Sequence, residues 1–199
     1  MKTTFLMKSD SVDLEQYTIK DIPGSSGRLD VLARSILSAL LCEGQFDINS
    51  KLIIFLARYG TFKLDPRFLD YSKFPKNEIL LSDSLCKLLK SEDIHNIHSN
   101  PLNGIKKLDL SFISFIKKLR IKGSPFLFIL KESGILFSQM LKEQRLMDEI
   151  YLIIGNQSED FINSEEFLHF NIPEISLGSK SLLASTTIRL LKLKMALLR

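Results

Sequence analysis

The segment Ile150-Tyr151-Leu152-Ile153-Ile154, followed by Gly155, is apolar throughout instead of alternating with polar residues. A strand that is apolar on both faces is typical of a parallel sheet covered by helices on both sides. Shorter or similar apolar runs occupy positions 52–56, 126–130 and 175–177. Helical patterns lie between these runs, so the sequence predicts an α/β fold with a mostly parallel sheet and helices on both of its faces.

The clearest helix is predicted over 29–41, where leucine and isoleucine recur at three- and four-residue spacing, and Gly44 is expected to end it. Further helices are predicted over 79–90, 110–121 and 181–199. Asn163 followed by Glu166 resembles a capping box that opens a short helix. Segment 91–104 reads as a loop, and the length of 199 residues fits one domain over 1–199.

The composition is that of an ordinary globular protein, with 45% hydrophobic and 25% charged residues. The formal net charge of +4 permits a polyanionic partner without demonstrating one. The two cysteines, Cys42 and Cys86, each lie in an apolar pattern that reads as helical, so neither a disulfide nor a metal site is expected. No apolar run is long enough to cross a bilayer or to form a signal peptide, and we expect a cytoplasmic protein.

Glycines follow three of the predicted strands, where ligands of open α/β sheets usually bind. Gly134, Gly155 and Gly178 would let backbone groups approach a ligand, although ordinary turns are the commoner reason for glycines at strand ends. The sequence lacks phosphate-binding and dinucleotide-binding glycine motifs and a hydrolase nucleophile elbow. His95 and His98 could face one metal ion, but no cysteine or carboxylate pair completes a ligand set, so no metal is expected.

The most distinctive segment is a turn-rich loop over 19–28 that leads directly into the predicted 29–41 helix. Arg28 offers a planar guanidinium suited to phosphate, and Asp30 places a carboxylate in the first helical turn. A structural interpretation is also open, because an aspartate at a helix start commonly interacts with the helix dipole and could pair with Arg28.

This segment, Lys20-Asp21-Ile22-Pro23-Gly24-Ser25-Ser26-Gly27-Arg28-Leu29-Asp30-Val31-Leu32, resembles the start of the archaeal tRNA (pseudouridine-54 N1)-methyltransferases of the SPOUT superfamily, and the likeness extends to Arg34. Ile153-Ile154-Gly155 resembles the family strand that enters the cofactor loop. The segment Ile175-Ser176-Leu177-Gly178-Ser179-Lys180-Ser181-Leu182-Leu183-Ala184-Ser185 resembles the family's C-terminal cofactor segment. The order and spacing of the three blocks agree with that family.

The resemblance implies a fold with a C-terminal trefoil knot, S-adenosyl-L-methionine as cofactor, a homodimer, and methylation of N1 of pseudouridine 54 in tRNA. It implies catalytic roles for Asp30 and Arg28 and RNA binding by Arg28 and Arg34. Asp30 would either position the base or accept the N1 proton. The implied cofactor-binding residues are Leu130, Gly155, Leu177, Gly178, Ser179, Lys180, Ser181, Leu182 and Thr187.

The chain departs from the family pattern at two polar sites. Gly155-Asn156-Gln157 stands where relatives usually carry Gly-Asp-His, and Leu183-Ala184-Ser185-Thr186-Thr187 replaces a His-Ala-Asn-His-Cys-like run. Two alternatives therefore stay open: the same chemistry on another RNA such as ribosomal RNA, or a catalytically degenerate RNA-binding or dimeric scaffold. The apolar segment 188–198 favours a homodimer, with a membrane-surface helix as the weaker alternative.

Overall fold

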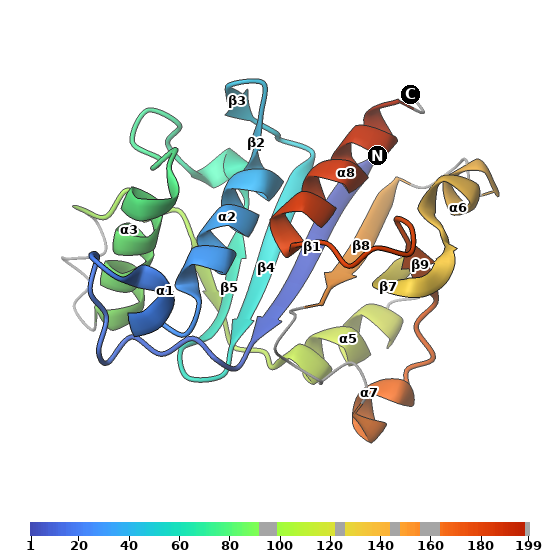
Figure 1. The fold of residues 1–199 in the computed structure, drawn as a ribbon, viewed down its shortest axis with the longest axis horizontal. Helices are drawn as coiled ribbons and strands as arrows, with labels where there is room; N and C mark the ends of the chain where they lie inside the picture. The colour runs from blue at the N-terminus through green and yellow to red at the C-terminus, as the bar shows by residue number, and fades with distance from the viewer. Residues whose placement is uncertain (92–98, 122–125, 144–147, 156–163, 198–199) are drawn as a thin grey trace.

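The computed structural model describes residues 1–91, 99–121, 126–143, 148–155 and 164–197 (Figure 1). A seven-stranded sheet runs in the order β6-β5-β4-β1-β8-β7-β9. Strands β4, β1, β8, β7 and β9 are parallel, whereas β5 is antiparallel to both β4 and β6. The strands are β1 (Lys2–Ser9), β4 (Ser50–Leu56), β5 (Gly60–Leu64), β6 (Lys106–Leu108), β7 (Leu127–Leu136), β8 (Glu149–Ile154) and β9 (Glu174–Ser176), and a separate hairpin is formed by β2 (Leu41–Cys42) and β3 (Gln45–Phe46).

Helices cover both faces of the sheet. The helical segments are α1 (Ile22–Ser25), α2 (Leu29–Leu40), a 3-10 turn η1 (Pro66–Phe68), α3 (Glu78–Lys90), α5 (Phe112–Ile121), α6 (Phe137–Glu143), α7 (Glu165–Leu168) and α8 (Ala184–Ala196). Helices α2, α3, α6 and α8 pack on one face, and α5 and α7 pack on the other. Figure 1 shows α2 and α8 side by side over the central strands.

The central strands are apolar on both faces because each face contributes to its own core. In β1, Phe5 and Met7 belong to the core under α2 and α8, whereas Leu6 between them belongs to the core under α5. In β8, Leu152 and Ile153 divide in the same way. The run over 52–56 is therefore buried along its whole length, and the run over 150–154 is buried apart from the partly buried Tyr151, as the sequence predicted. In the run over 126–130, only Phe128 and Ile129 are fully buried, and Phe126 is exposed.

The structure confirms most predicted elements and corrects several details. Strand β1 was not predicted, since only Phe5, Leu6 and Met7 in it form an apolar run, yet it lies at the centre of the sheet. The prediction that Gly44 ends the 29–41 helix was wrong: α2 ends at Leu40, and Gly44, with φ of +74°, forms the hairpin turn. Cys42 was wrongly placed in a helical pattern, because it lies exposed in β2, whereas Cys86 is buried in α3.

The C-terminal helix, α8, begins later than predicted, at Ala184. One of its faces packs against the core of the same chain. Ile188, Leu191 and Met195 are buried in the core, whereas Leu193 and Leu197 are exposed. Lys192 ties α8 to the end of α2 by donating hydrogen bonds to backbone carbonyls of 38, 39 and 41, and it forms an ion pair with Asp47 at 3.0 Å. Three of the apolar side chains on which the dimer prediction rested are thus covered by the chain itself, and Leu193 and Leu197 are not.

Some predictions concern residues that lie outside the described parts of the chain. These are the possible capping role of Asn163, the pair His95 and His98, and the departure at Asn156 and Gln157. In the described parts, no helix is long and apolar enough to span a membrane.

Candidate active site

The carboxyl ends of β8 and β9, with the middle of β7 between them, bring together the predicted cofactor-binding segments. In β7, Ile129 pairs with Ile153 of β8 on one side, and Leu130 pairs with Ile175 of β9 on the other. Gly155 directly follows β8, and Leu177 directly follows β9. Because these strands are parallel, Leu130, Gly155 and Leu177 lie at the same edge of the sheet, where open α/β sheets bind their ligands.

Ser176 is the buried polar residue that connects two of these strand ends, and sequence reasoning did not single it out as a site residue. Its hydroxyl is placed 3.2 Å from the carbonyl of Glu132 and 3.0 Å from that of Gly178, and it accepts a hydrogen bond from the Gly178 backbone N–H at 2.9 Å. The residue is 3% exposed. The loop that follows β9 is therefore hydrogen-bonded to the irregular stretch of β7 between Leu130 and Ile135, a link between segments distant in sequence that no local pattern reveals.

The chain inside β7 also approaches β9 closely. The two strands pair at Leu130 and again at Ile135, with a shift in register between these positions. A Cβ atom on Gly134 would lie 2.6 Å from the backbone of Glu174 and Ile175, closer than side chains come to backbone. Only glycine fits there. Lys131 of β7 adds an ion pair with Glu174 of β9 at 2.6 Å. Both close packing and charge therefore hold this stretch of β7 against β9.

The loop after β9 presents its backbone to open space. Gly178 has φ of +129°, which favours glycine, and no atom lies within 4 Å of the position that its Cβ would take. Ser179, Lys180 and Ser181 are exposed, and Leu182 is partly buried. Thr187 lies apart from this loop, one turn inside α8, where it is 8% exposed. The structure therefore brings the strand ends and the loop together and places Thr187 in the helix behind them.

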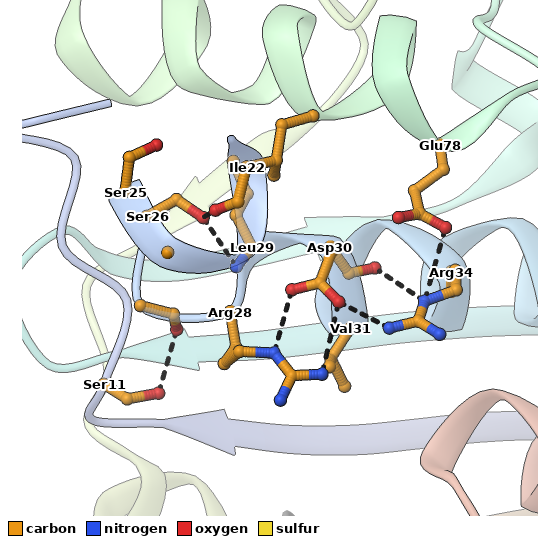
Figure 2. A network of polar contacts seen from close by, with 12 residues as sticks. Ser11, Ile22, Ser25, Ser26, Arg28, Leu29, Asp30, Val31, Arg34 and Glu78 are labelled. Atoms are coloured by element: carbon orange, nitrogen blue, oxygen red, sulfur yellow. Dashed lines mark hydrogen bonds and ion pairs between the residues drawn. The ribbon is translucent and has the colours of Figure 1, made fainter. Parts of the chain in front are cut away.

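The second candidate group surrounds Asp30, which is 2% exposed in the first turn of α2 (Figure 2). Arg28 donates to both carboxylate oxygens, from Nε at 3.1 Å and from Nη2 at 3.3 Å. Arg34 donates from Nη2 to Oδ2 at 2.5 Å, and its Nε lies 3.3 Å from the carboxylate of Glu78 on α3. The structure thus confirms the predicted pairing of Arg28 with Asp30 and adds Arg34 to it.

Backbone geometry fixes the position of Arg28. Gly27 and Arg28 both adopt the left-handed backbone conformation, with φ of +56° and +71°. Non-glycine residues with this conformation are uncommon and cluster at functional sites. The Ser26 hydroxyl accepts a hydrogen bond from the Leu29 N–H at 3.0 Å and so caps α2 in place of a side chain at Arg28. The guanidinium of Arg28, which has no acceptor with which to cap the helix, is about half exposed, and the donors that Asp30 does not use are available to a ligand.

Charge keeps Asp30 ionised in this buried position. Burial alone would raise the pKa of the carboxyl, but hydrogen bonds and charge from Arg28, followed by those from Arg34, outweigh it and hold the pKa below its ordinary value of 3.8. A carboxylate whose pKa is lowered is a weak base. Of the two roles that the sequence left open, positioning the base or accepting its proton, the contacts favour positioning, exerted through Arg28 and Arg34.

The lowered pKa values predict an acid-labile fold. The pKa of Asp65, between β5 and η1, is lowered chiefly by a hydrogen bond from Arg67, so Asp30 and Asp65 both bind protons more readily in the unfolded chain. Their stabilising contributions are present above about pH 4 and are lost as the pH falls through the lower, folded-state values. Urea unfolding should show a smaller loss of stability between about pH 7 and pH 3 for Asp30→Asn than for the wild type, and equal losses would contradict this assignment.

The two candidate groups share one edge of the sheet but are separate within the chain. The Ser11 hydroxyl donates to the Gly27 carbonyl at 3.0 Å, which ties the loop before α2 to the segment after β1. Strand β1 is next to β8, since Met7 pairs with Ile154. Within the described residues, the ion pairs of Asp30 nevertheless involve Arg28 and Arg34 and none of the segments after β8 or β9.

Comparison with known proteins relates the whole chain to one group of enzymes. No protein-family model matches it. It is 25% identical over 195 residues to the tRNA (pseudouridine(54)-N(1))-methyltransferase of Thermococcus onnurineus, with 93% of this chain and 92% of that protein covered. The protein of the same name from Pyrococcus abyssi is 22% identical over 202 residues, with 94% of each chain covered.

Solved structures support the same relationship at the level of the fold. The crystal structure of Archaeoglobus fulgidus Nep1 bound to S-adenosylhomocysteine superposes with a TM-score of 0.59 at 14% identity, covering 98% of this chain and 97% of that one. The resemblance seen in the sequence motifs is therefore confirmed over nearly the entire length: this chain is a divergent relative of those proteins.

Proposed function

We propose that this divergent relative of the tRNA (pseudouridine(54)-N(1))-methyltransferases is itself an S-adenosyl-L-methionine-dependent methyltransferase, and that it methylates N1 of pseudouridine 54 in tRNA. The observation that carries the proposal is that the ends of β8 and β9, after Ile154 and Ser176, meet beside Leu130 of β7, in a chain related along its whole length to these enzymes. The trefoil knot implied by the family is part of the same proposal.

The residues at the strand ends fit a cofactor held largely by backbone groups. Gly155 and Gly178 keep side chains away from the strand ends, and the space beside Gly178 is open. Leu130 and Leu177 are partly buried against the core and would form the apolar wall of a pocket. Backbone contacts do not depend on side-chain identity. We therefore assign cofactor binding to the segment 177–182 together with Leu130, Gly155 and Thr187, despite the departures at 183–187.

S-adenosylmethionine supplies an electrophilic methyl carbon, and its transfer to a nitrogen is an in-line displacement that requires no metal. The task of the protein is to align the nucleophile and to exclude water. Arg28 and Arg34 would hold RNA phosphate or the target ring with the guanidinium donors that Asp30 does not use. Asp30 fixes the direction of both guanidiniums. A carboxylate or a water molecule would accept the N1 proton as the bond forms.

The separation of the two groups within one chain is the reason to include a homodimer in the proposal. A second copy would place the Arg28 loop of one subunit at the strand-end loops of the other, and closed two-fold dimers are the commonest soluble assemblies. The exposed side chains of Leu193 and Leu197 on α8 offer apolar surface for such contact. Light scattering at micromolar concentration should give twice the 22.8 kDa chain mass. A monomer mass would contradict the dimer and leave the cofactor assignment standing.

Cofactor binding is predicted to depend on Gly155. Saturating S-adenosylmethionine should raise the melting temperature of the wild-type protein, because a ligand that binds only the folded state stabilises it. The branched side chain of Gly155→Val should occupy ligand space and weaken binding more than about tenfold in calorimetry. Lys87→Ala, on the exposed side of α3, is the control that should bind normally. Absence of any heat or melting shift for the wild type would favour the scaffold alternative.

A further inference from the structure

A cluster of basic side chains with an exposed aromatic ring lies at the opposite end of the sheet from the strand-end loops. It is built around the carboxylate of Asp65, which directly follows β5 and is 2% exposed. Hereafter it is called the basic patch, and its members are Lys51 on β4, Lys63 on β5, Arg67 and Phe68 on η1, and Lys106 on β6.

Asp65 anchors the basic patch. Arg67 donates to both of its oxygens, from Nε at 2.9 Å and from Nη2 at 2.6 Å. The ammonium groups of Lys51 and Lys63 lie 3.9 Å and 4.0 Å from the same carboxylate. A single bidentate arginine already satisfies a buried carboxylate, so neutralising Asp65 does not require the two lysines. Arg67 is about half exposed and keeps its remaining donors on the surface.

The exposed ring of Phe68 connects Lys106 to the other cations of the basic patch. Its ring is 52% exposed, with Lys106 Nζ at 4.4 Å and Arg67 Cζ at 5.9 Å from the ring centre. Lys106 pairs with Lys63 in the register of β5 and β6, which places both side chains on the same face of the sheet. The backbone under the ring is firmly packed, because a Cβ on Gly104 would lie 1.8 Å from the Phe68 carbonyl oxygen. An exposed phenyl ring is therefore presented between cations on a fixed support.

The charge of the basic patch identifies a polyanion as the ligand class. Three cations, Lys51, Lys63 and Arg67, lie beside one carboxylate, and Lys106 lies over the neighbouring ring, which leaves a local surplus of three positive charges. Lysine and arginine interleaved with an accessible aromatic ring is the arrangement with which proteins bind single-stranded nucleic acid, since cations contact phosphates and bases stack on the ring. The aromatic ring has no role toward a simple anion.

We propose that the basic patch is a second RNA-binding surface, which holds an unpaired segment of the substrate RNA by phosphate contacts and by stacking of a base on Phe68. The inference rests on the proposed function for the identity of the RNA. Lys51 stands near the start of β4 and Leu56 at its end, about 17 Å apart at the usual rise per residue. A few nucleotides cover that distance. One RNA could therefore reach both the patch and the opposite edge of the sheet, where the target base would be methylated.

Binding of a tRNA transcript, followed by fluorescence anisotropy at several salt concentrations, tests the patch. Replacing Lys63 and Lys106 by alanine should weaken binding about tenfold and lower the slope of log K against log salt by about 1.5, since each phosphate contact contributes about 0.7–0.9. Phe68→Leu keeps an apolar side chain but removes the aromatic face, and should weaken binding about five- to a hundredfold with the slope unchanged. Lys87→Ala, which removes one exposed cation on α3, should bind like the wild type.

The result that overturns the inference is wild-type affinity and salt slope in both patch variants, with melting temperatures showing that they are folded. Equal loss of binding in Lys87→Ala would also overturn it, because the effect would then reflect overall charge. S-adenosylmethionine affinity should be unchanged in the patch variants. If the wild-type protein bound tRNA through the patch but transferred no methyl group, the proposed function would fail while the patch assignment stood.

Discussion

Methyl transfer by the Asp30→Asn variant is expected to be about 10²–10⁴-fold slower than in the wild type in single-turnover measurements with unmodified-N1 tRNA. The neutral amide of asparagine keeps only one acceptor oxygen, so the bidentate contact with Arg28 is lost, and so is the negative charge that attracts both Arg28 and Arg34. Because the two arginines are partly exposed, they remain solvated without Asp30, and the variant should stay folded.

The same variant separates the two roles proposed for Asp30. If it positions the arginines, as its contacts favour, the loss should appear as weaker RNA binding together with a slower step, and Arg28→Ala should reproduce the weaker binding with a flatter salt dependence. If it accepts the N1 proton, binding should be spared and the acid limb of the pH–rate profile should disappear. An unchanged rate per folded molecule would remove Asp30 from the active site altogether and leave it a structural residue of α2.

Gly27→Ala is expected to lower the free energy of unfolding by about 2–5 kcal/mol, the largest stability effect that we predict for a single methyl group. The added Cβ would lie 1.7 Å from the carbonyl oxygen of Ser11, and φ at this position is +56°. The left-handed backbone alone costs a non-glycine residue about 1–2 kcal/mol, and overpacking adds about 1–3 kcal/mol. The loop that carries Arg28 must shift, so RNA binding and methyl transfer should fall with stability.

Gly44→Ala is the matched control for this prediction. Gly44 has a similarly positive φ of +74°, but no atom lies within 4 Å of its Cβ position. Only the backbone preference is then lost, about 1 kcal/mol, and activity should be retained. Chemical denaturation of the two variants therefore separates backbone strain from the contact with Ser11. If both substitutions lowered the free energy of unfolding equally, the close approach of Gly27 to Ser11 would not be what holds the loop before α2 in place.

The buried strands could be predicted from the sequence because a strand that is buried on both faces needs apolar residues at successive positions, which appear as a continuous apolar run. It missed β1 because the ends of this strand are polar: Thr3 and Thr4 are each 3% exposed, and such residues do not appear apolar in a pattern. The hydroxyl of Thr3 donates to the sulfur of Met195, a partner from the other end of the chain. Gly44 and Cys42 were misplaced because the hydrophobic pattern of α2 continues past Leu40 into a hairpin that only tertiary packing reveals.

The candidate site was predictable where a local motif carries it. The pairing of Asp30 with Arg28 and, at i,i+4 spacing within α2, with Arg34 is local, whereas the addition of Glu78 needs the packing of α3 against α2. Ser176 and Gly134 could not be identified from local pattern, since their importance comes from the approach of β7 to β9. The basic patch was missed for the same reason, because its cations are contributed by β4, β5, β6 and η1.

Mass spectrometry of tRNA treated with the purified protein tests the central claim most directly. Transcripts carrying pseudouridine at position 54 would be incubated with S-adenosylmethionine labelled in its methyl group, digested to nucleosides and fragments, and analysed for the label. We predict one labelled methyl group, on N1 of the pseudouridine at position 54, that is absent when uridine replaces pseudouridine there. Label at another nucleotide, or in ribosomal RNA alone, would contradict the substrate assignment, and no label in any RNA would contradict the assignment of methyltransferase activity.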